Sequence, residues 1–469
     1  MITIKTYQDL ERVKQGAPEA LEEFVLTAVT EHQNSNDFET AVDAELYYKH
    51  RNPTISRYQQ FVTNVLGSKV PAKWKPNNKI FSNWFYYFVT QAVQYLLGNG
   101  VQFNKPDTKK KLGKDFDRKV KDLARKAKEG GVSFGFWNMD HIEVMGLSEF
   151  VPLYDEENGA LRAGVRFWQL DADKPMRFTL YEEDGYTDFV KKDSMVKLLN
   201  SEKGKTPYKQ KYTKSIAEGE KIYEGENYPS FPIVPFYNIN RQSDLVGLRN
   251  TIDAYDLMSS GLINNVSEGD FIFWILKNCG GMTQEDDEAF LEQVLTSHVA
   301  HVGGDNDDEP GISTEKVEAA FAGSQAALAQ LKEQLYTDAM ALNVEIIKAG
   351  NVTATQIKSA YEPINEKTDD FEYCANDFVN GILKLAGIDD EPSYVRSIIA
   401  NQSEDVQTLL SASEYLDDEF VVRRLCALLG CPDDADAILK RRDAEASDRF
   451  KTLFKNTDPE NKDDEEDEE

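Results

Sequence analysis

Residues 231–269 constrain the fold more than any other stretch, because two kinds of structure meet there. Their first part carries two prolines, which fix an extended or turning backbone and exclude a helix. Ser243 then supplies a hydroxyl that can cap a helix. Apolar residues follow at spacings of three or four, the period of one helical face: Leu245, Leu248, Ile252, Tyr255, Met258, Leu262 and Val266. We therefore predict a helix over residues 243–268, about 40 Å long at about 1.5 Å per residue.

A second long helix is predicted over residues 323–342. One stripe of it carries Leu328, Leu331, Leu335 and Leu342. Between the two helices, residues 269–322 have the pattern of a small α/β unit, with a strand at 271–276, a helix at 284–295 and a strand at 298–302. Because long helices flank this unit, we expect it to lie away from the main body, at the end of a helical pair.

Residues 1–240 have the pattern of one mixed domain, so the expected fold class is α+β. Helices are predicted at 19–31, 37–49, 83–97 and 114–128. The period then changes to two, which predicts a meandering antiparallel sheet with strands at 141–147, 150–155, 161–170, 176–184 and 186–192. The polar residues 201–225 are expected to form a loop or an insertion.

The rest of the chain is predicted to be mostly helical. Residues 343–351 read as a short irregular segment, and a helix is expected to begin at Thr353, where a capping-box pattern occurs. That helix continues to Gly387, with Pro363 expected to kink it. Short helices are expected over residues 388–455. The acidic end, residues 456–469, is too charged to pack and is expected to be disordered.

Net charge restricts the functions open to the chain. Its 469 residues carry 82 acidic and 53 basic side chains, a formal charge of −29, which disfavours tight binding to nucleic acid by general attraction to phosphates. Residues 105–128 are locally basic, and we interpret them as a solvated helical face, with a phosphate-contacting patch as the alternative. No stretch is apolar enough to predict a membrane span or a signal peptide, so we expect a soluble intracellular protein. The scattered cysteines are expected to be free thiols: Cys279, Cys374, Cys426 and Cys431.

Catalytic signatures are missing from the sequence. The GKT at residues 204–206 lacks the earlier glycine of a phosphate loop. His298 and His301 stand near an acidic run, but their spacing does not match a helical pair of metal ligands and no cysteine pair completes a set. We predict neither a metal nor a cofactor, and we expect the protein not to be an enzyme; an unrecognised site in the mixed domain is the enzymatic alternative.

Four blocks of sequence, in this order, resemble the portal proteins of tailed bacteriophages. They are AELYYKHRNPTI (44–55), PNNKIFSNWFYYFVTQAVQYLLGNGVQF (76–103), PIVPFYNINRQSDLVGLRNTIDAYDLMSSGLINN (232–265) and AGNVTATQIKSAYEPINEKTDDFE (349–372). The resemblance extends over most of the chain and is loose in the small α/β unit and in the last eighty residues or so.

The resemblance implies the parts of a portal subunit. Residues 1–241 would form the wing, 242–268 and 323–342 the two stem helices, and 269–322 the clip. Residues 343–352 would form the tunnel loop, 353–387 a long kinked wing helix, 388–455 a helical crown and 456–469 the acidic tail.

The resemblance also implies roles for particular residues. Those expected to face DNA from the tunnel loop are Asn343, Lys348, Gly350 and Asn351. Those expected to pack the stem are Leu245, Leu248, Ile252, Tyr255, Met258, Leu328, Leu331 and Leu335, with Leu245, Ile252 and Met258 also expected to contact neighbouring subunits. Those expected to contact partners from the clip are Phe271, Phe273 and Trp274.

A portal protein would form a homododecameric ring at one capsid vertex and conduct double-stranded DNA without sequence specificity. Its expected partners are the terminase large subunit, a head–tail adaptor, and the major capsid and scaffolding proteins, with no membrane. It would be found in the virion, and in the host cytoplasm during assembly. The alternative is an acidic helical scaffold or adaptor of the virion with no DNA channel.

Overall fold

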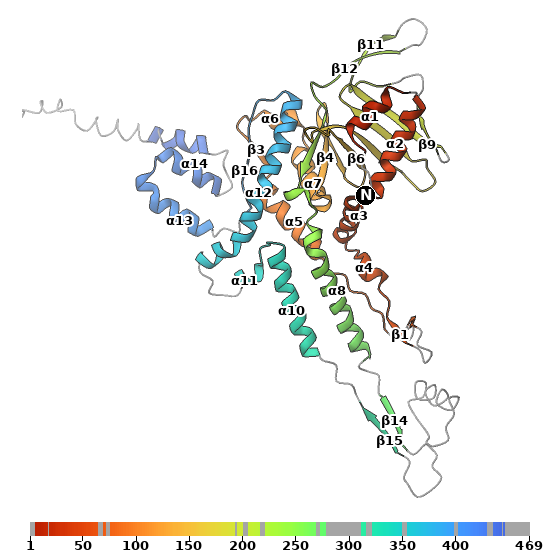
Figure 1. Ribbon diagram of the computed structural model, residues 1–469. Helices are drawn as coiled ribbons and strands as arrows, with labels where there is room; N and C mark the ends of the chain where they lie inside the picture. The colour runs from red at the N-terminus through yellow and green to blue at the C-terminus, as the bar shows by residue number, and fades with distance from the viewer. Residues whose placement is uncertain are drawn as a thin grey trace, which may run out of the picture. The chain divides into compact units, whose positions relative to one another are not determined.

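The computed structural model describes residues 5–16, 18–63, 69–71, 76–192, 195–199, 205–215, 221–268, 273–277, 311–315, 321–348, 354–397, 402–428, 435–442 and 444–445. The chain divides into two compact units, Met1–Ser397 and Ile398–Glu469. The first unit carries most of the described elements (Figure 1).

The N-terminal part of the first unit is mainly helical. Its helices are α1 (Tyr7–Lys14), α2 (Pro18–Gln33), α3 (Asn36–Tyr48), α4 (Pro53–Arg57), α5 (Trp84–Leu97), α6 (Thr108–Leu112) and α7 (Phe116–Gly130). The four helices predicted from the sequence are confirmed as α2, α3, α5 and α7. Polar caps begin two of the others, because the side chains of Thr6 and Asn52 accept the first free amides of α1 and α4. A short hairpin of β1 (Phe61–Thr63) and β2 (Lys69–Pro71) follows α4.

Five consecutive strands form an antiparallel meander. They are β6 (Phe150–Tyr154), β7 (Leu161–Trp168), β8 (Arg177–Glu182), β9 (Gly185–Lys192) and β10 (Met195–Leu198), and they neighbour each other in sequence order. Side chains from one face of this sheet share a buried cluster with α1 and α2, including Leu10, Val25, Val165 and Phe178. The predicted meander is confirmed for β6 to β9, and β10 extends it by a strand that was not predicted.

A second sheet of three strands was not predicted. It has the order β13–β4–β5 and consists of β4 (Val132–Asn138), β5 (His141–Gly146) and β13 (Ile233–Tyr237). The expectation that residues 141–147 belong to the single meander is wrong, because β5 pairs with β4 and β4 pairs with the distant β13. Since β13 is an edge strand, it tolerates Pro235, which has no amide to donate.

The polar residues 201–225 also differ from their prediction as a loop. Their described part contains β11 (Lys209–Ser215) and most of β12 (Lys221–Glu226), which pair as an antiparallel hairpin. The alternation of Lys, Tyr and Thr residues suits a strand, and this pattern was obscured by the high charge of the segment.

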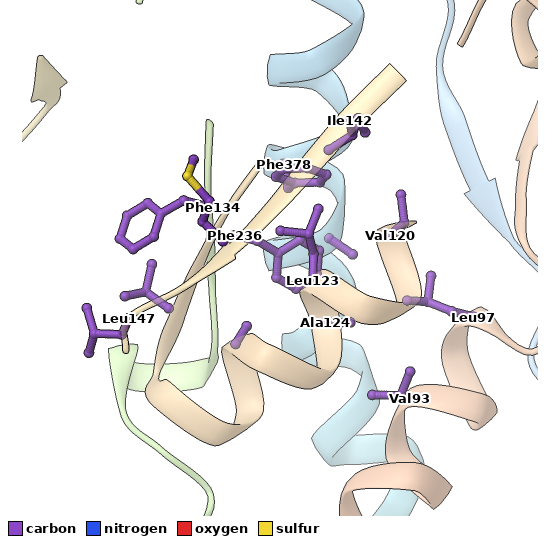
Figure 2. Close-up of a cluster of buried hydrophobic side chains, with 14 of the residues drawn as sticks. Val93, Leu97, Val120, Leu123, Ala124, Phe134, Ile142, Leu147, Phe236 and Phe378 are labelled. Carbon is purple, nitrogen blue, oxygen red and sulfur yellow. The ribbon is translucent and has the colours of Figure 1, made fainter. Parts of the chain in front are cut away.

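The larger core lies where α5, α7 and α12 pack against the three-stranded sheet (Figure 2). The rings of Phe236 on β13 and Phe378 on α12 are 5.1 Å apart. Gly135 on β4 permits this approach, since a Cβ there would lie 2.7 Å from the Phe378 ring. The labelled side chains in Figure 2 are Val93, Leu97, Val120, Leu123, Ala124, Phe134, Ile142, Leu147, Phe236 and Phe378.

Three helices follow the sheets. They are α8 (Leu245–Glu268), α10 (Phe321–Asp338) and α12 (Ala354–Ala386), and α8 and α10 lie side by side (Figure 1). The helix predicted over 243–268 is confirmed as α8. The one predicted over 323–342 ends earlier, because Met340 adopts a left-handed backbone with φ of 50°.

The segment after α10 is more regular than expected. Residues predicted to be irregular contain the short helix α11 (Val344–Lys348). The predicted helix around Pro363 is confirmed, with Pro363 inside α12. Between α8 and α10, β14 (Phe273–Lys277) pairs with β15 (Gly311–Glu315). The helix predicted at 284–295 and the strand at 298–302 lie outside the described residues.

The last strand of the first unit is β16 (Pro392–Tyr394), which pairs with β3 (Val101–Phe103). The second unit contains α13 (Gln402–Ala412), a 3-10 turn and α14 (Asp418–Leu428). A small cluster of Val422, Cys426 and Ala435 is buried in it. The acidic tail lies outside the described residues.

Candidate functional site

The helix pair α8–α10 is the element that the sequence analysis places at the centre of function. It is antiparallel, and the Thr251 hydroxyl lies 3.3 Å from the Asp338 carboxylate. The first turns of α8 enter the large core, where Leu248 and Ile252 share a buried cluster with Leu335 of α10. Trp84 of α5 contacts both helices, with its ring 5.7 Å from Tyr255 and 5.5 Å from Tyr336. One end of the pair is therefore fixed in the body of the unit.

The predicted stem residues have unequal environments. Leu245, Leu248, Ile252 and Leu335 are buried, while Tyr255, Met258, Leu328 and Leu331 are half-buried. The expectation that Leu245 and Ile252 contact a neighbouring subunit is wrong, because both are 1% exposed within a single chain. They hold α8 in its own core and cannot reach another copy.

Other apolar side chains of α8 are exposed instead. Their exposed fractions are 48% for Val246, 40% for Leu257, 43% for Ile263 and 52% for Val266. Gly247 and Gly261 of the same helix would each accept a Cβ with nothing within 4 Å. Val266 belongs to the apolar stripe found in the sequence. The other three were missed, because the search for one helical face does not report apolar residues outside that face.

A buried charged group holds the start of α8. This junction cluster consists of Lys128, Asn238, Asp244 and Lys367. The Asp244 carboxylate lies 3.0 Å from the ammonium of Lys367 and 3.5 Å from that of Lys128, and it accepts a hydrogen bond of 2.7 Å from the Asn238 amide. The Asp244 backbone amide donates to the Lys128 carbonyl at 2.9 Å.

The cluster joins four elements. Lys128 ends α7, Asp244 precedes α8, and Lys367 lies on α12 and donates at 3.1 Å to the carbonyl of Ala339, just after α10. The Lys128 ammonium also lies 3.9 Å from the centre of the Phe371 ring. The start of α8 and the end of α10 are therefore both connected to the carboxylate of Asp244, the second of them through Lys367.

Burial and charge act in opposite directions in this cluster. Burial alone would raise the pKa of Asp244, but the charges of Lys128 and Lys367 and the Asn238 hydrogen bond outweigh it and hold that pKa well below its usual range. Burial lowers the pKa of Lys128 to about 8, because Asp244 compensates only partly for lost water. The distances agree with this partial compensation of Lys128, because Asp244 lies closer to Lys367, at 3.0 Å, than to Lys128, at 3.5 Å.

A second anchor runs along the outer part of α8. The strap, residues 76–82, lies antiparallel to the helix and donates its backbone amides to helix side chains. The amides of Asn78, Ile80 and Ser82 donate to Asn264, Ser260 and Asp256, at 2.7, 2.9 and 2.9 Å. Two residues of extended chain and four residues of helix both span about 6–7 Å, so the two spacings match.

The polar stripe of Asp256, Ser260 and Asn264 was not identified in the sequence. Its signal is a polar residue at every fourth position, which places the three side chains along one line of the helix. Asp256 is fully buried, and burial raises its pKa against the hydrogen bonds from Ser82 and Asn52. The Asn52 amide donates to Asp256 at 2.9 Å and to Asp253 at 2.8 Å, and so ties α4 to the same helix.

A cavity of about 160 Å³ lies between the strap, α4 and α8. Its lining includes Tyr58, Asn77, Lys79, Leu257, Gly261 and Asn264. We call it the strap pocket. Lys79 carries a positive charge, and the rest of the described lining is neutral.

The predicted tunnel loop is described only in part. Asn343 is half-buried and accepts the Glu345 amide at 3.1 Å, and Lys348 ends α11. The side chain of Lys348 and all of Gly350 and Asn351 lie outside the described residues. Near this segment Glu345 pairs with Lys332 of α10 at 2.7 Å.

The side chains predicted to contact partners from the clip lie outside the described residues. Phe273 and Trp274 lie on β14, but their side chains, like Phe271 as a whole, are outside the described residues. His298, His301 and the acidic run after them are outside as well. Among the described residues, no group of three or more potential ligands could hold a metal ion.

The basic residues 105–128 are mostly neutralised within the chain. Lys109 pairs with Asp117 at 3.0 Å, Lys126 with Glu149 at 3.3 Å, and Arg125 with Glu129 at 2.7 Å. Lys128 is completely buried, so it cannot be part of a solvated face or of a phosphate patch. For the other paired residues the interpretation as a charged helical surface remains the simpler one.

The two described cysteines, Cys374 and Cys426, are thiols outside any disulfide bond, as expected. No helix in the described part of the chain has the length and apolar character needed to cross a membrane.

The chain is similar to phage portal proteins in its sequence. Residues 28–417 match the family model described as "Phage portal protein, SPP1 Gp6-like". The portal protein of Clostridium phage phiCD119 is 24% identical over 378 residues, covering 74% of this chain and 81% of that protein. The portal protein of Bacillus phage SPP1 is 23% identical over 346 residues, covering 69% of this chain and 64% of that protein.

Solved structures with a similar chain include two gene-transfer-agent necks, described as "Neck of native GTA particle computed with C12 symmetry" and "Neck of empty GTA particle computed with C6 symmetry". The first is 11% identical with a TM-score of 0.39, covering 73% of this chain and 89% of that one. The second is 10% identical with a TM-score of 0.40, covering 75% and 90%.

Proposed function

This chain belongs to the SPP1 Gp6-like family of phage portal proteins, and we propose that twelve copies form a ring whose central channel conducts double-stranded DNA during packaging and ejection. The family is a structural one, and the fold is α+β. The portal protein is a component of the virion, at the capsid vertex.

We assign the parts of the ring subunit as the resemblance implies. The wing is residues 1–241 with the long helix 353–387, the stem is the pair α8–α10, and the clip is residues 269–322. The tunnel loop is 343–352 and the crown 388–455. Within the last range, β16 pairs with β3 of the first unit, so residues 392–394 are attached to the wing in this chain.

The helix pair carries this proposal. Its inner end is fixed by the core and by the junction cluster, whereas Val246, Leu257, Ile263 and Val266 leave apolar surface exposed on a single chain. Exposed apolar surface beyond isolated side chains marks interaction sites. A head-to-tail contact between identical subunits, repeated around an axis, closes a ring and would cover this surface.

The net charge of the chain favours a conduit for DNA over a protein that binds DNA tightly. A formal charge of −29 gives a surface that repels phosphates, so a duplex can slide without many salt-dependent contacts. We propose that Lys348, with Asn343, Gly350 and Asn351 nearby, makes a non-specific phosphate contact in the channel. Packaging by Lys348→Glu particles tests this, because packaging at the wild-type level would remove that contact.

Partners follow from the same assignment. We propose that the clip, including Phe271, Phe273 and Trp274, faces the terminase large subunit during packaging and a head–tail adaptor afterwards. The wing would face the major capsid and scaffolding proteins, and assembly would take place in the host cytoplasm.

The mass of the purified protein in solution tests the ring. We expect a species of about twelve times the 53.2 kDa of one chain. A compact monomer at all concentrations would contradict the ring and would favour the alternative of a scaffold or adaptor.

A further inference from the structure

Two opposite charges lie on opposite sides of the α8–α10 pair. Lys79 lines the strap pocket beside α8, and Glu333 is exposed on α10. Neither forms an ion pair with any other described residue; Lys79 instead donates to the carbonyl of Ser56. A pocket with one cation and an exposed carboxylate are complementary in charge.

Their positions prevent pairing within one chain. Thr251 faces α10, because its hydroxyl contacts Asp338. Ser260 of the polar stripe comes nine residues after Thr251, which at about 100° per residue places the strap on the side of α8 away from α10. By the same arithmetic Glu333, five residues before Asp338, lies about 140° around α10 from the side that faces α8.

Their heights along the pair are similar. Thr251 and Asp338 are level, and the helices run in opposite directions with the same rise, so Glu333 is level with Asp256. The strap binds Asp256, Ser260 and Asn264, so the backbone of Lys79 lies one to two turns from that level, about 6–12 Å. Its ammonium donates to the carbonyl of Ser56 in α4. The combined length of a lysine and a glutamate side chain spans a difference of this size.

Rotation about a ring axis keeps every element at its own height, and a head-to-tail contact brings one side of a subunit against the opposite side of the next. We propose that the strap pocket is the docking site for α10 of the adjacent copy, with Glu333 of that copy seated against Lys79. This inference rests on the ring proposed above and assigns one of its interfaces.

The pocket suits such an occupant in shape as well. Leu257 and Gly261 belong both to its lining and to the exposed side of α8, so a helix packed on α8 would cover its mouth. A Cβ at Gly261 would meet nothing within 4 Å, which leaves room for close approach. On α10, Ala326 and Ala329 lie seven and four residues before Glu333 on the same side of the helix and are exposed, so the approaching face is small.

Charge reversal tests the pairing in full-length protein. We expect Lys79→Glu and Glu333→Lys each to raise the protein concentration needed for ring formation about tenfold or more, because like charges at an interface are unfavourable. The double variant Lys79→Glu with Glu333→Lys should recover most of the loss. As a matched control, Lys79→Glu with Thr337→Lys places the new cation one turn further from the strap on α10, about 15 Å from the level of the Lys79 backbone, and should not recover it.

Covalent capture gives a second readout that does not depend on assembly strength. Lys79→Cys with Glu333→Cys, treated with a short bismaleimide, should give covalent chains of two or more subunits on a denaturing gel. Either single variant, and Lys79→Cys with Thr337→Cys, should give only the background of the wild-type thiols.

The outcomes separate the two proposals. If wild-type protein forms rings but charge reversal has no effect and no specific capture occurs, the Lys79–Glu333 contact is wrong and the ring stands. Normal ring formation by both single variants with specific capture of Thr337→Cys in place of Glu333→Cys would also overturn it. If wild-type protein never forms rings, the proposed function fails and this inference fails with it.

Discussion

The carboxylate of Asp244 lies 3.0 Å from the ammonium of Lys367, and this buried contact joins the start of α8 to α12. Asp244 is the acceptor on which the junction cluster depends, because Lys128 and Asn238 also point to it. The place where the helix pair enters the body is therefore held by charge as well as by apolar packing.

Replacing that carboxylate should be costly. Asp244→Asn would leave two ammonium groups without their shared counter-charge, and breaking a buried pair in this way costs about 3–5 kcal/mol. Urea unfolding of the variant should show this loss. The exposed Asp338→Asn, whose partner is a hydroxyl, serves as the control and should cost less than about 1 kcal/mol. Similar losses in both variants would contradict the role given to Asp244.

Replacing Lys128 should not lower the stability of the protein at neutral pH, in contrast to replacing Asp244. Its pKa in the folded protein, about 8, is below the value near 10.4 of an unfolded lysine, so the folded state binds fewer protons between these values. The penalty for burying this charge is fully present below pH 8 and is relieved as pH rises toward 10. Lys128→Met should therefore be at least as stable as wild type at pH 7, with its advantage shrinking between pH 8 and 10.

Unfolding midpoints measured at several pH values check this sign. Lys126→Met is a suitable control, since Lys126 is on the same helix but partly exposed. An advantage of Lys128→Met that grows with pH would show that the ammonium is not the buried, weakly paired group described above.

The position of the strap on α8 should depend on each side-chain oxygen that accepts one of its backbone amides. Ser260→Ala removes the oxygen that accepts the Ile80 amide and leaves that amide without a protein partner, at a cost of about 1–3 kcal/mol where it stays buried. We expect faster hydrogen exchange at Ile80 and its neighbours in the strap. Ser267→Ala changes an exposed serine of the same helix and should leave exchange in the strap unchanged. Equal exchange in both variants would remove the anchoring role of the polar stripe.

The contact between β4 and α12 predicts an overpacked variant. Gly135→Ala would place a methyl group 2.7 Å from the Phe378 ring, and such overpacking typically costs about 1–3 kcal/mol. Phe378→Leu alone removes a buried ring and is also destabilising. The double variant should lose less stability than the sum of the losses of the two single variants, because the smaller leucine side chain leaves room for the new methyl group. If the losses measured by thermal unfolding simply add, this contact is wrong.

Local patterns predicted the local elements well. The run of apolar residues from Leu245 to Val266 predicted α8, and the strands from β6 to β9 followed from alternation and turns, since these signals depend on neighbours in sequence. The pairing of β4 with β13 was not predictable in this way. It joins segments far apart in the chain, and no local period records which strand is the partner.

The anchors of the helix pair were missed for a related reason. Lys128 read as one more cation of a basic run, and Asp244 as a residue near a helix start; only the fold brings them together and buries them. Leu245 and Ile252 were placed on the correct helix, but the contact with a neighbouring subunit that was also expected of them is wrong, because a stripe in sequence does not tell which apolar side meets its own core.

Electron cryomicroscopy of the purified full-length protein tests the central claim most directly. We predict rings of about twelve subunits around an open channel, with the α8–α10 pairs of adjacent copies packed side by side and Val246, Leu257, Ile263 and Val266 covered. Particles that are single compact chains, or rings in which this surface of α8 stays exposed to solvent, would contradict the account.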